Sequence, residues 1–306
     1  MIRTLAFHRD FRRYSGGHGK LWDYFNHANA HPAWRASVYL TPGSASAENP
    51  WLADPATIDR DWAPARADAL LLGGMDWQAY PHDAPARPVI NLVQGVRHAD
   101  PQHRLYHFLS RRAIRICVGA PVAEAIQATG QVNGPVRVIQ AALRLPGLDA
   151  TSSMRTGIFI GALKQPELGR ALAADLQREG RTVILADHWM PRLDYLAQLA
   201  TAEVAVLLPL ECEGFFLPAL EAMALGCATV VPDCIGNRAY LAPGDNALVP
   251  PMQLEALLQA VKQLDDAALR MRLSQAGVQT AARFDLERER AAFHALLDDL
   301  DTLWRQ

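Results

Sequence analysis

Two glutamates eight residues apart, Glu213 and Glu221, flank a turn that contains one glycine and two phenylalanines. Glu213 precedes a predicted short helix, and Glu221 lies about one turn inside it. The first amide groups of a helix have no partner within the helix and readily bind phosphate. A carboxylate accepts two hydrogen bonds, as a sugar diol such as ribose requires. We therefore expect a phosphorylated ligand to contact both glutamates. The amides expected to face its phosphate belong to Gly214, Phe215, Phe216 and Leu217.

The residues around this turn predict the elements that position it. Apolar runs at 204–208 and 228–231 are typical of strands, and the stretch between them has room for a loop and a short helix. Pro218 suits the first turn of a helix, where its missing N–H costs nothing, and Gly226 suits the residue after the last turn. The segment therefore predicts one β-α-β unit with the glutamates at its strand-to-helix turn.

A glycine-rich turn follows the first predicted strand, at 2–7. Gly16 and Gly17 precede a predicted helix, and Lys20 adds a positive charge at its start. Such a turn either lets the backbone approach a ligand or is merely tight, and the sequence favours neither interpretation.

Composition limits what these turns can belong to. The chain has 306 residues, 50% of them hydrophobic, and a formal net charge of -2. This size suits one large or two medium domains, and the charge argues against a dedicated nucleic-acid binder. No apolar run has the length of a signal peptide or approaches the ~20 residues of a membrane span, so we expect a cytoplasmic protein. The four cysteines form no CxxC pair, and neither a zinc site nor a disulfide framework is expected.

Histidine and arginine are concentrated between residues 98 and 115. A solvated basic helix is the simpler interpretation. The alternative is a surface that meets an anionic acceptor or phosphate headgroups, peripheral at the inner face of the membrane. His103 and His107 also have a metal-ligand spacing, but no third ligand is suitably spaced, so no metal site is expected.

Strand-like and helix-like segments alternate along most of the chain. This order predicts an α/β fold in which parallel sheets are covered by helices. We expect two Rossmann-like domains, at residues 1–148 and 149–306, with a cleft between them. The final helix either belongs to the second domain or packs back on the first.

The segment 213–231 resembles the E-x7-E region of retaining GT-B glycosyltransferases, a large family that includes many bacterial lipopolysaccharide and polysaccharide sugar transferases. The likeness continues through 233–241, so about 45 residues carry it. It implies a GT-B enzyme that takes a nucleotide diphosphate sugar in the C-terminal domain and a glycan or lipid-linked acceptor in the N-terminal domain. It also implies that Glu221 holds the ribose and Glu213 the transferred sugar, with retention of configuration. The donor is a substrate, a UDP-, GDP- or dTDP-sugar, and no separate cofactor is expected.

One position departs from this family. The glycine that ends the first strand of the C-terminal domain, Gly161, is usually followed by an arginine and, a few residues on, by a lysine that neutralise the diphosphate. Here Ala162 follows, so Lys164 and Arg192, with Lys20 of the first domain, are the expected cations. No Asp-x-Asp pair occurs in a suitable loop, and no catalytic metal is expected.

Two other functions remain open at this stage. One is a catalytically weak or inactive nucleotide-sugar binding module, which the missing arginine favours. The other is a GT-B-fold nucleotide-sugar epimerase, which the unequal roles implied for the two glutamates do not favour.

Overall fold

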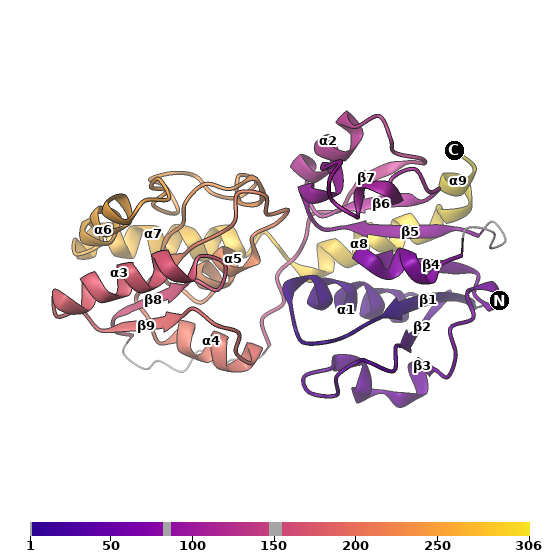
Figure 1. Ribbon diagram of the computed structural model, residues 1–306, viewed down its shortest axis with the longest axis horizontal. Coiled ribbons are helices and arrows are strands. Elements are labelled where there is room, and N and C mark those ends of the chain that lie inside the picture. Colours follow the sequence, from indigo (N-terminus) through magenta and orange to yellow (C-terminus); the bar gives the residue numbers. More distant parts are fainter. Residues whose placement is uncertain (1, 82–86, 147–154) are drawn as a thin grey trace. The chain divides into compact units, whose positions relative to one another are not determined.

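The computed structural model describes residues 2–81, 87–146 and 155–306. The chain divides into two compact units (Figure 1). Unit 1 comprises residues 1–141 and 286–306, and unit 2 comprises residues 142–285. The boundary expected between residues 148 and 149 falls in 147–154, outside the described residues. The C-terminal segment from Leu286 groups with unit 1.

Unit 1 is built on a seven-stranded parallel sheet with the strand order β3-β2-β1-β4-β5-β6-β7. Its central strands are apolar and buried on both faces, as parallel strands between helical layers must be. The sheet confirms the predicted α/β class. Its strands are β1 (Arg3–Arg9), β2 (Trp34–Leu40), β3 (Ile58–Asp59), β4 (Ala69–Gly73), β5 (Val89–Val93), β6 (Ile114–Cys117) and β7 (Val136–Val138).

Helices α1 and α8 lie side by side in unit 1 (Figure 1). Lys20 of α1 is buried, and its Nζ donates to Asp23 Oδ2 at 2.7 Å and to Glu289 Oε2 of α8 at 2.8 Å. His27 Nε2 lies 3.0 Å from the same Glu289 oxygen. These contacts join the C-terminal segment to the first helix through charge as well as packing. The helices of unit 1 are α1 (Gly16–Asn29), α2 (Ala120–Ala128), α8 (Leu286–Asp298) and α9 (Leu300–Arg305).

Unit 2 is built on a four-stranded parallel sheet with the order β11-β10-β8-β9. Its strands are β8 (Ile158–Gly161), β9 (Val183–Ala186), β10 (Val204–Leu207) and β11 (Ala228–Val230). Its helices are α3 (Pro166–Arg178), α4 (Arg192–Ala200), α5 (Leu217–Ala224), α6 (Leu254–Gln263) and α7 (Ala267–Ala281). Short 3-10 helices elsewhere in the two units occupy Pro50–Ala53, Pro55–Thr57, Pro64–Arg66, Gly74–Ala79, Val96–Ala99, Tyr106–Phe108 and Ile235–Asn237.

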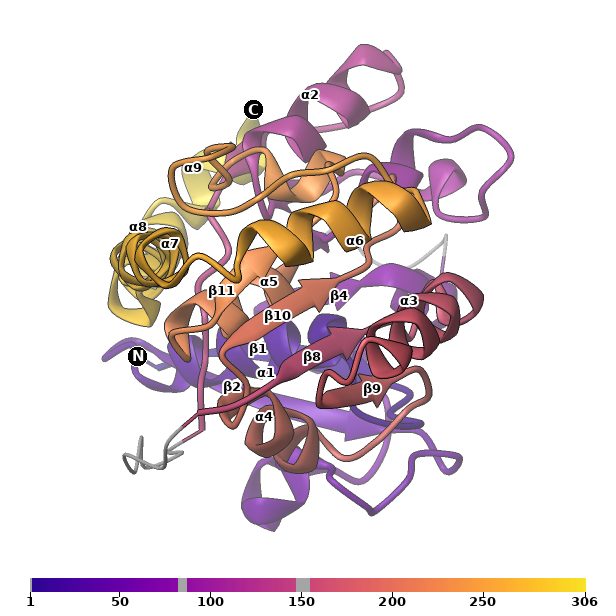
Figure 2. The same ribbon diagram turned by 90° about the vertical axis from the view of Figure 1, so that its left-hand side faces the viewer.

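Two hydrophobic cores cover the two faces of the unit 2 sheet. Because strand side chains alternate between faces, Ile158 and Ile160 of β8 pack with α3 and α6, while Phe159 packs with α4 and α5. Figure 2 shows α3 and α6 on the face turned to the viewer. Residues of α7 contribute to both cores. The sheet is therefore a buried platform whose loops are held from both sides.

None of the helices in the described residues is both long and apolar enough to cross a membrane.

The buried ion pair between α1 and α8 predicts a stability effect. Glu289→Ala removes one partner and leaves the Lys20 ammonium inadequately compensated inside unit 1. We expect a loss of about 3 kcal/mol in the free energy of unfolding. Glu287→Ala, which removes an exposed carboxylate of the same helix, is the control, and we expect it to cost less than about 1 kcal/mol. Equal losses in urea unfolding of the two variants would contradict a stabilising role for the α1–α8 pair.

Candidate functional site

The loops after β8 and β10 lie together at the carboxyl edge of the unit 2 sheet. The two strands pair in parallel, with Gly161 beside Leu207, so the segments that follow them leave the sheet at the same edge. In open α/β sheets this edge is where ligands bind. The expected site residues Lys164 and Glu213 follow these two strands.

Lys164 and Glu213 form an ion pair across the two loops. The Lys164 side chain is 38% exposed and that of Glu213 is 14% exposed. The Lys164 ammonium also lies 5.6 Å from the centroid of the Phe216 ring, within the range of a cation–π contact. The Glu213 carboxylate accepts a hydrogen bond of 3.3 Å from the amide of Leu210. The cation and the carboxylate are therefore neighbours at one edge of the sheet.

Glu221 forms a second ion pair, with Arg192 of α4. Arg192 Nη1 donates to Glu221 Oε1 at 2.6 Å, and Nη2 donates to the carbonyl of Arg144 at 2.9 Å. The Glu221 side chain is only 4% exposed, and Arg192 is its ion-pair partner. The structure thus joins the four charged residues that the sequence assigns to this end of unit 2 in two ion pairs.

Tyr195 joins this group although it belongs to no recognised motif. Burial, together with the negative charge of Glu221, raises the pKa of Tyr195, so its hydroxyl is a proton donor at neutral pH. A Cβ added at Gly161 would lie 3.1 Å from that hydroxyl oxygen. The signal in the sequence is its i,i+3 spacing from Arg192, which places both side chains on one side of α4.

Two of the four amides expected to be free at the start of helix α5 are already hydrogen-bonded. The amide of Phe216 donates to the carbonyl of Gly236 at 3.4 Å, and the amide of Leu217 donates to the carbonyl of Phe215 at 3.0 Å. The expectation that both amides face a phosphate is therefore corrected, because they are used to close the loop. Of the four expected amides, those of Gly214 and Phe215 enter the proposal below.

The loop before α5 is held by the segment that follows β11. A Cβ on Gly236 would lie 2.7 Å from the amide nitrogen of Phe215 and 2.8 Å from the carbonyl oxygen of Glu213, so only glycine allows this approach. Tyr240 donates a hydrogen bond from its hydroxyl to the carbonyl of Phe216. The turn that carries Glu213 is therefore fixed by its neighbours.

The packing of helix α3 explains why the residue after Gly161 is an alanine and not an arginine. The residue is fully buried, and a Cβ added at Gly169 of α3 would lie 2.2 Å from the Ala162 Cβ. Helix α3 therefore packs directly on the turn after Gly161, and an arginine at 162 would displace the helix. The charge that this position lacks lies two residues later, at Lys164.

The glycine-rich turn of unit 1 lies at the beginning of a helix. Helix α1 begins at Gly16, Ser15 caps it by accepting a hydrogen bond from the amide of His18, and Gln94 Nε2 donates to the carbonyl of Gly17 at 3.2 Å. Lys20 is 4% exposed and ion-paired with two carboxylates of its own unit. The expectation that it helps to neutralise a diphosphate is therefore corrected.

The basic segment 98–115 is not a helix. The described chain has 3-10 turns at Val96–Ala99 and Tyr106–Phe108, followed by strand β6. Two of its arginines, Arg111 and Arg115, hold loop carbonyls of unit 1, whereas Arg104 is exposed. Arg115 is fully buried and donates to three carbonyls, and Arg111 donates to the carbonyls of Trp77 and Tyr80 at 3.0 and 2.8 Å. The interpretation as a solvated basic helix is wrong because these guanidinium groups satisfy loop carbonyls.

Among the described residues, no group of three or more His, Cys, Asp or Glu side chains is arranged to hold a metal ion.

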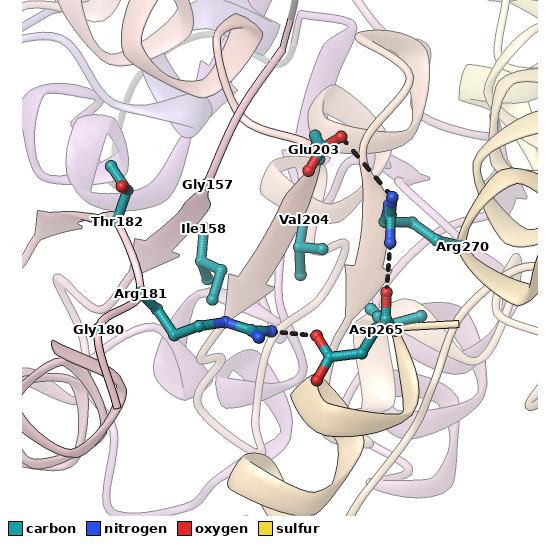
Figure 3. Close-up of a pocket in the computed structure, with 10 residues that line it drawn as sticks. Gly157, Ile158, Gly180, Arg181, Thr182, Glu203, Val204, Asp265 and Arg270 are labelled. Atoms are coloured by element: carbon teal, nitrogen blue, oxygen red, sulfur yellow. Dashed lines mark hydrogen bonds and ion pairs between the residues drawn. The ribbon is translucent and has the colours of Figure 1, made fainter. Parts of the chain in front are cut away.

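A cavity of about 290 Å³ lies at the opposite, amino edge of the unit 2 sheet (Figure 3). Its charged side chains face one another: Arg181 pairs with Asp265, and Arg270 lies 3.8 Å from Glu203. Arg270 Nη1 also donates to the carbonyl of Leu264 at 2.7 Å. These charged side chains pair with one another, and they lie at the opposite end of the strands from the glutamate turn. The cavity is therefore distinct from the candidate site.

The whole chain has the fold of solved glycosyltransferases. It is similar to sucrose-phosphate synthase from Thermosynechococcus elongatus, with 14% identity over 98% of this chain and 99% of that one and a TM-score of 0.71. It is also similar to Anabaena HepE, solved in complex with UDP and glucose, with 13% identity over 97% and 100% of the chains and a TM-score of 0.73. A third similar structure is WaaG, a glycosyltransferase involved in lipopolysaccharide biosynthesis, with 13% identity over 95% and 99% of the chains and a TM-score of 0.68.

A sequence match adds to the likeness of fold. Residues 154–266 match the family model described as glycosyl transferases group 1, and they include both glutamates and both cations of the candidate site. The matched residues lie within unit 2. No curated protein sequence matches the chain.

The basic segment generates a prediction on stability and pH. Burial, with the nearby charge of Arg97, lowers the pKa of His98 to about 3, so the folded protein holds this imidazole neutral. An unfolded histidine takes up a proton near pH 6.5. Stability is therefore full above that pH and falls as the pH drops toward 3. The free energy of unfolding falls between pH 7 and pH 5 in the wild type because of this histidine. We expect the fall to be roughly 2 kcal/mol smaller in His98→Asn.

Urea unfolding at the two pH values measures this difference. His107→Asn, which removes an exposed histidine of the same segment, is the control and should follow the wild type. If His98→Asn has the same pH dependence as His107→Asn, the buried neutral state of His98 is contradicted.

Proposed function

We propose that the chain is a glycosyltransferase that moves a sugar from a nucleotide diphosphate sugar to a glycan or glycolipid acceptor. The observation that supports this most directly is a set of two carboxylate–cation ion pairs, whose residues lie in segments that follow the carboxyl ends of β8, β9 and β10. The carboxylates suit sugar hydroxyls and the cations suit a diphosphate. The match to a glycosyl transferase model over the same residues supports the same reaction.

In this proposal the donor lies across the start of helix α5. Glu221 accepts hydrogen bonds from the ribose hydroxyls, and Glu213 accepts them from the transferred sugar. Lys164, Arg192 and the amides of Gly214 and Phe215 meet the diphosphate. Charge grows on the leaving diphosphate as the sugar–phosphate bond breaks, and fixed cations and N–H dipoles stabilise that charge. UDP-sugars are the first donors to examine, because HepE is solved with UDP-glucose.

The proposal assigns retention of configuration and no catalytic metal. Retention follows from the resemblance of the glutamate turn to retaining enzymes. In this proposal the diphosphate is neutralised by two side-chain cations and not by a metal ion. Each cation lies beside one of the two carboxylates. The acceptor is assigned to unit 1 by the same resemblance.

Release of free UDP tests the proposed reaction. The chain is mixed with UDP-glucose and a panel of glycan and glycolipid acceptors, and UDP release is followed with and without acceptor. Acceptor-dependent release is the expected result. Tight UDP binding without release from any sugar nucleotide would identify a binding module instead.

The role of Glu221 gives a specific prediction. Glu221→Ala removes the ribose contact, and we expect the affinity for UDP, measured by calorimetry, to fall by about tenfold. Glu211→Ala removes an exposed carboxylate of the neighbouring loop and should leave the affinity unchanged. Equal UDP affinity in wild type and Glu221→Ala would exclude the ribose contact.

A further inference from the structure

The ion pair between Lys164 and Glu213 joins two residues with different duties in the proposed site. Lys164 meets the diphosphate, which is present in both the donor and the product. Glu213 meets the transferred sugar, which is present in the donor alone. We infer that Glu213 competes with the nucleoside diphosphate product for Lys164, so that this pair lets the site discriminate between donor and product. The inference rests on the proposed function.

Glu213 is the fixed partner in this pair. Its carboxylate accepts from the amide of Leu210, its own amide donates to the carbonyl of Leu210 at 3.3 Å, and Gly236 packs against its carbonyl. Lys164 is the more exposed partner, on a long side chain. An exposed lysine exchanges one anionic partner for another at low cost. The ammonium therefore moves between Glu213 and a phosphate while the carboxylate stays in place.

The bound donor satisfies both groups at once. Its diphosphate takes Lys164, and its sugar hydroxyls donate to Glu213. When the sugar has left, the Glu213 carboxylate has lost the hydroxyl donors that the sugar supplied, and it pairs with Lys164 again. The Lys164 ammonium is then shared between the Glu213 carboxylate and the diphosphate, and pairing with the first weakens its contact with the second. The product is therefore held less tightly than the same diphosphate would be without the Glu213 charge.

The second ion pair of the site has no such effect. Glu221 is almost fully buried, and Arg192 is tied to it and to the carbonyl of Arg144. The ribose that Glu221 contacts is present in donor and product alike. The two glutamates should therefore respond in opposite directions to loss of charge, although both are ion-paired in the structure.

Calorimetry with UDP on the full chain tests this inference. Glu213→Gln keeps the shape of the side chain but releases Lys164, and we expect UDP to bind about two- to fivefold more tightly than to wild type. In the Lys164→Met background the same substitution should have no effect, because the cation under competition is gone. Glu179→Gln breaks the exposed Lys262–Glu179 pair of unit 2, away from the site, and should leave UDP affinity unchanged.

The outcomes separate this inference from the proposed function. Tighter UDP binding by Glu213→Gln that disappears in the Lys164→Met background supports the competition. UDP binding to wild type with unchanged or weaker binding by Glu213→Gln would overturn the competition and leave the proposed function standing. If wild type binds none of UDP, GDP and dTDP, both fail.

Discussion

Parallel pairing of β8 with β10 is the constraint on which the candidate site depends. It sends the loops after Gly161 and Leu207 to the same edge of the unit 2 sheet, and so sets Lys164 beside Glu213. The two hydrophobic cores fix the sheet from both faces, and helices α4 and α5 then bring Arg192 to Glu221. Backbone geometry thus places opposite charges in pairs, and the proposed chemistry uses those pairs.

The site balances its own charge. Each carboxylate expected to bind sugar hydroxyls has a cation expected to meet phosphate as its ion-pair partner. A ligand with hydroxyls and a diphosphate satisfies both kinds of group together, whereas a simple anion takes the cations and leaves the carboxylates uncompensated. The arrangement therefore favours a sugar nucleotide over free phosphate. The packing of Gly169 on Ala162 belongs to the same arrangement, because it keeps a large cation away from that turn and leaves the task to Lys164.

Local patterns predicted the fold class and the glutamate turn, because both are written in short stretches of sequence. Apolar runs and the Pro218 and Gly226 boundaries place helix α5 almost at its observed limits. Pairing between distant residues was beyond such patterns. Lys20 reads as a cation beside a glycine turn, yet its partner Glu289 lies 269 residues away along the chain. The arginines of 98–115 read as a surface, but Arg115 lies in an internal strand and satisfies the carbonyls of a loop.

The central claim is that the carboxyl edge of unit 2 binds a nucleoside diphosphate. A crystal structure of the chain with UDP tests it most directly. We predict the ribose on Glu221 and the diphosphate beside Lys164 and Arg192. Density for UDP at the amino edge instead, in the cavity lined by Arg181 and Arg270, would contradict the claim.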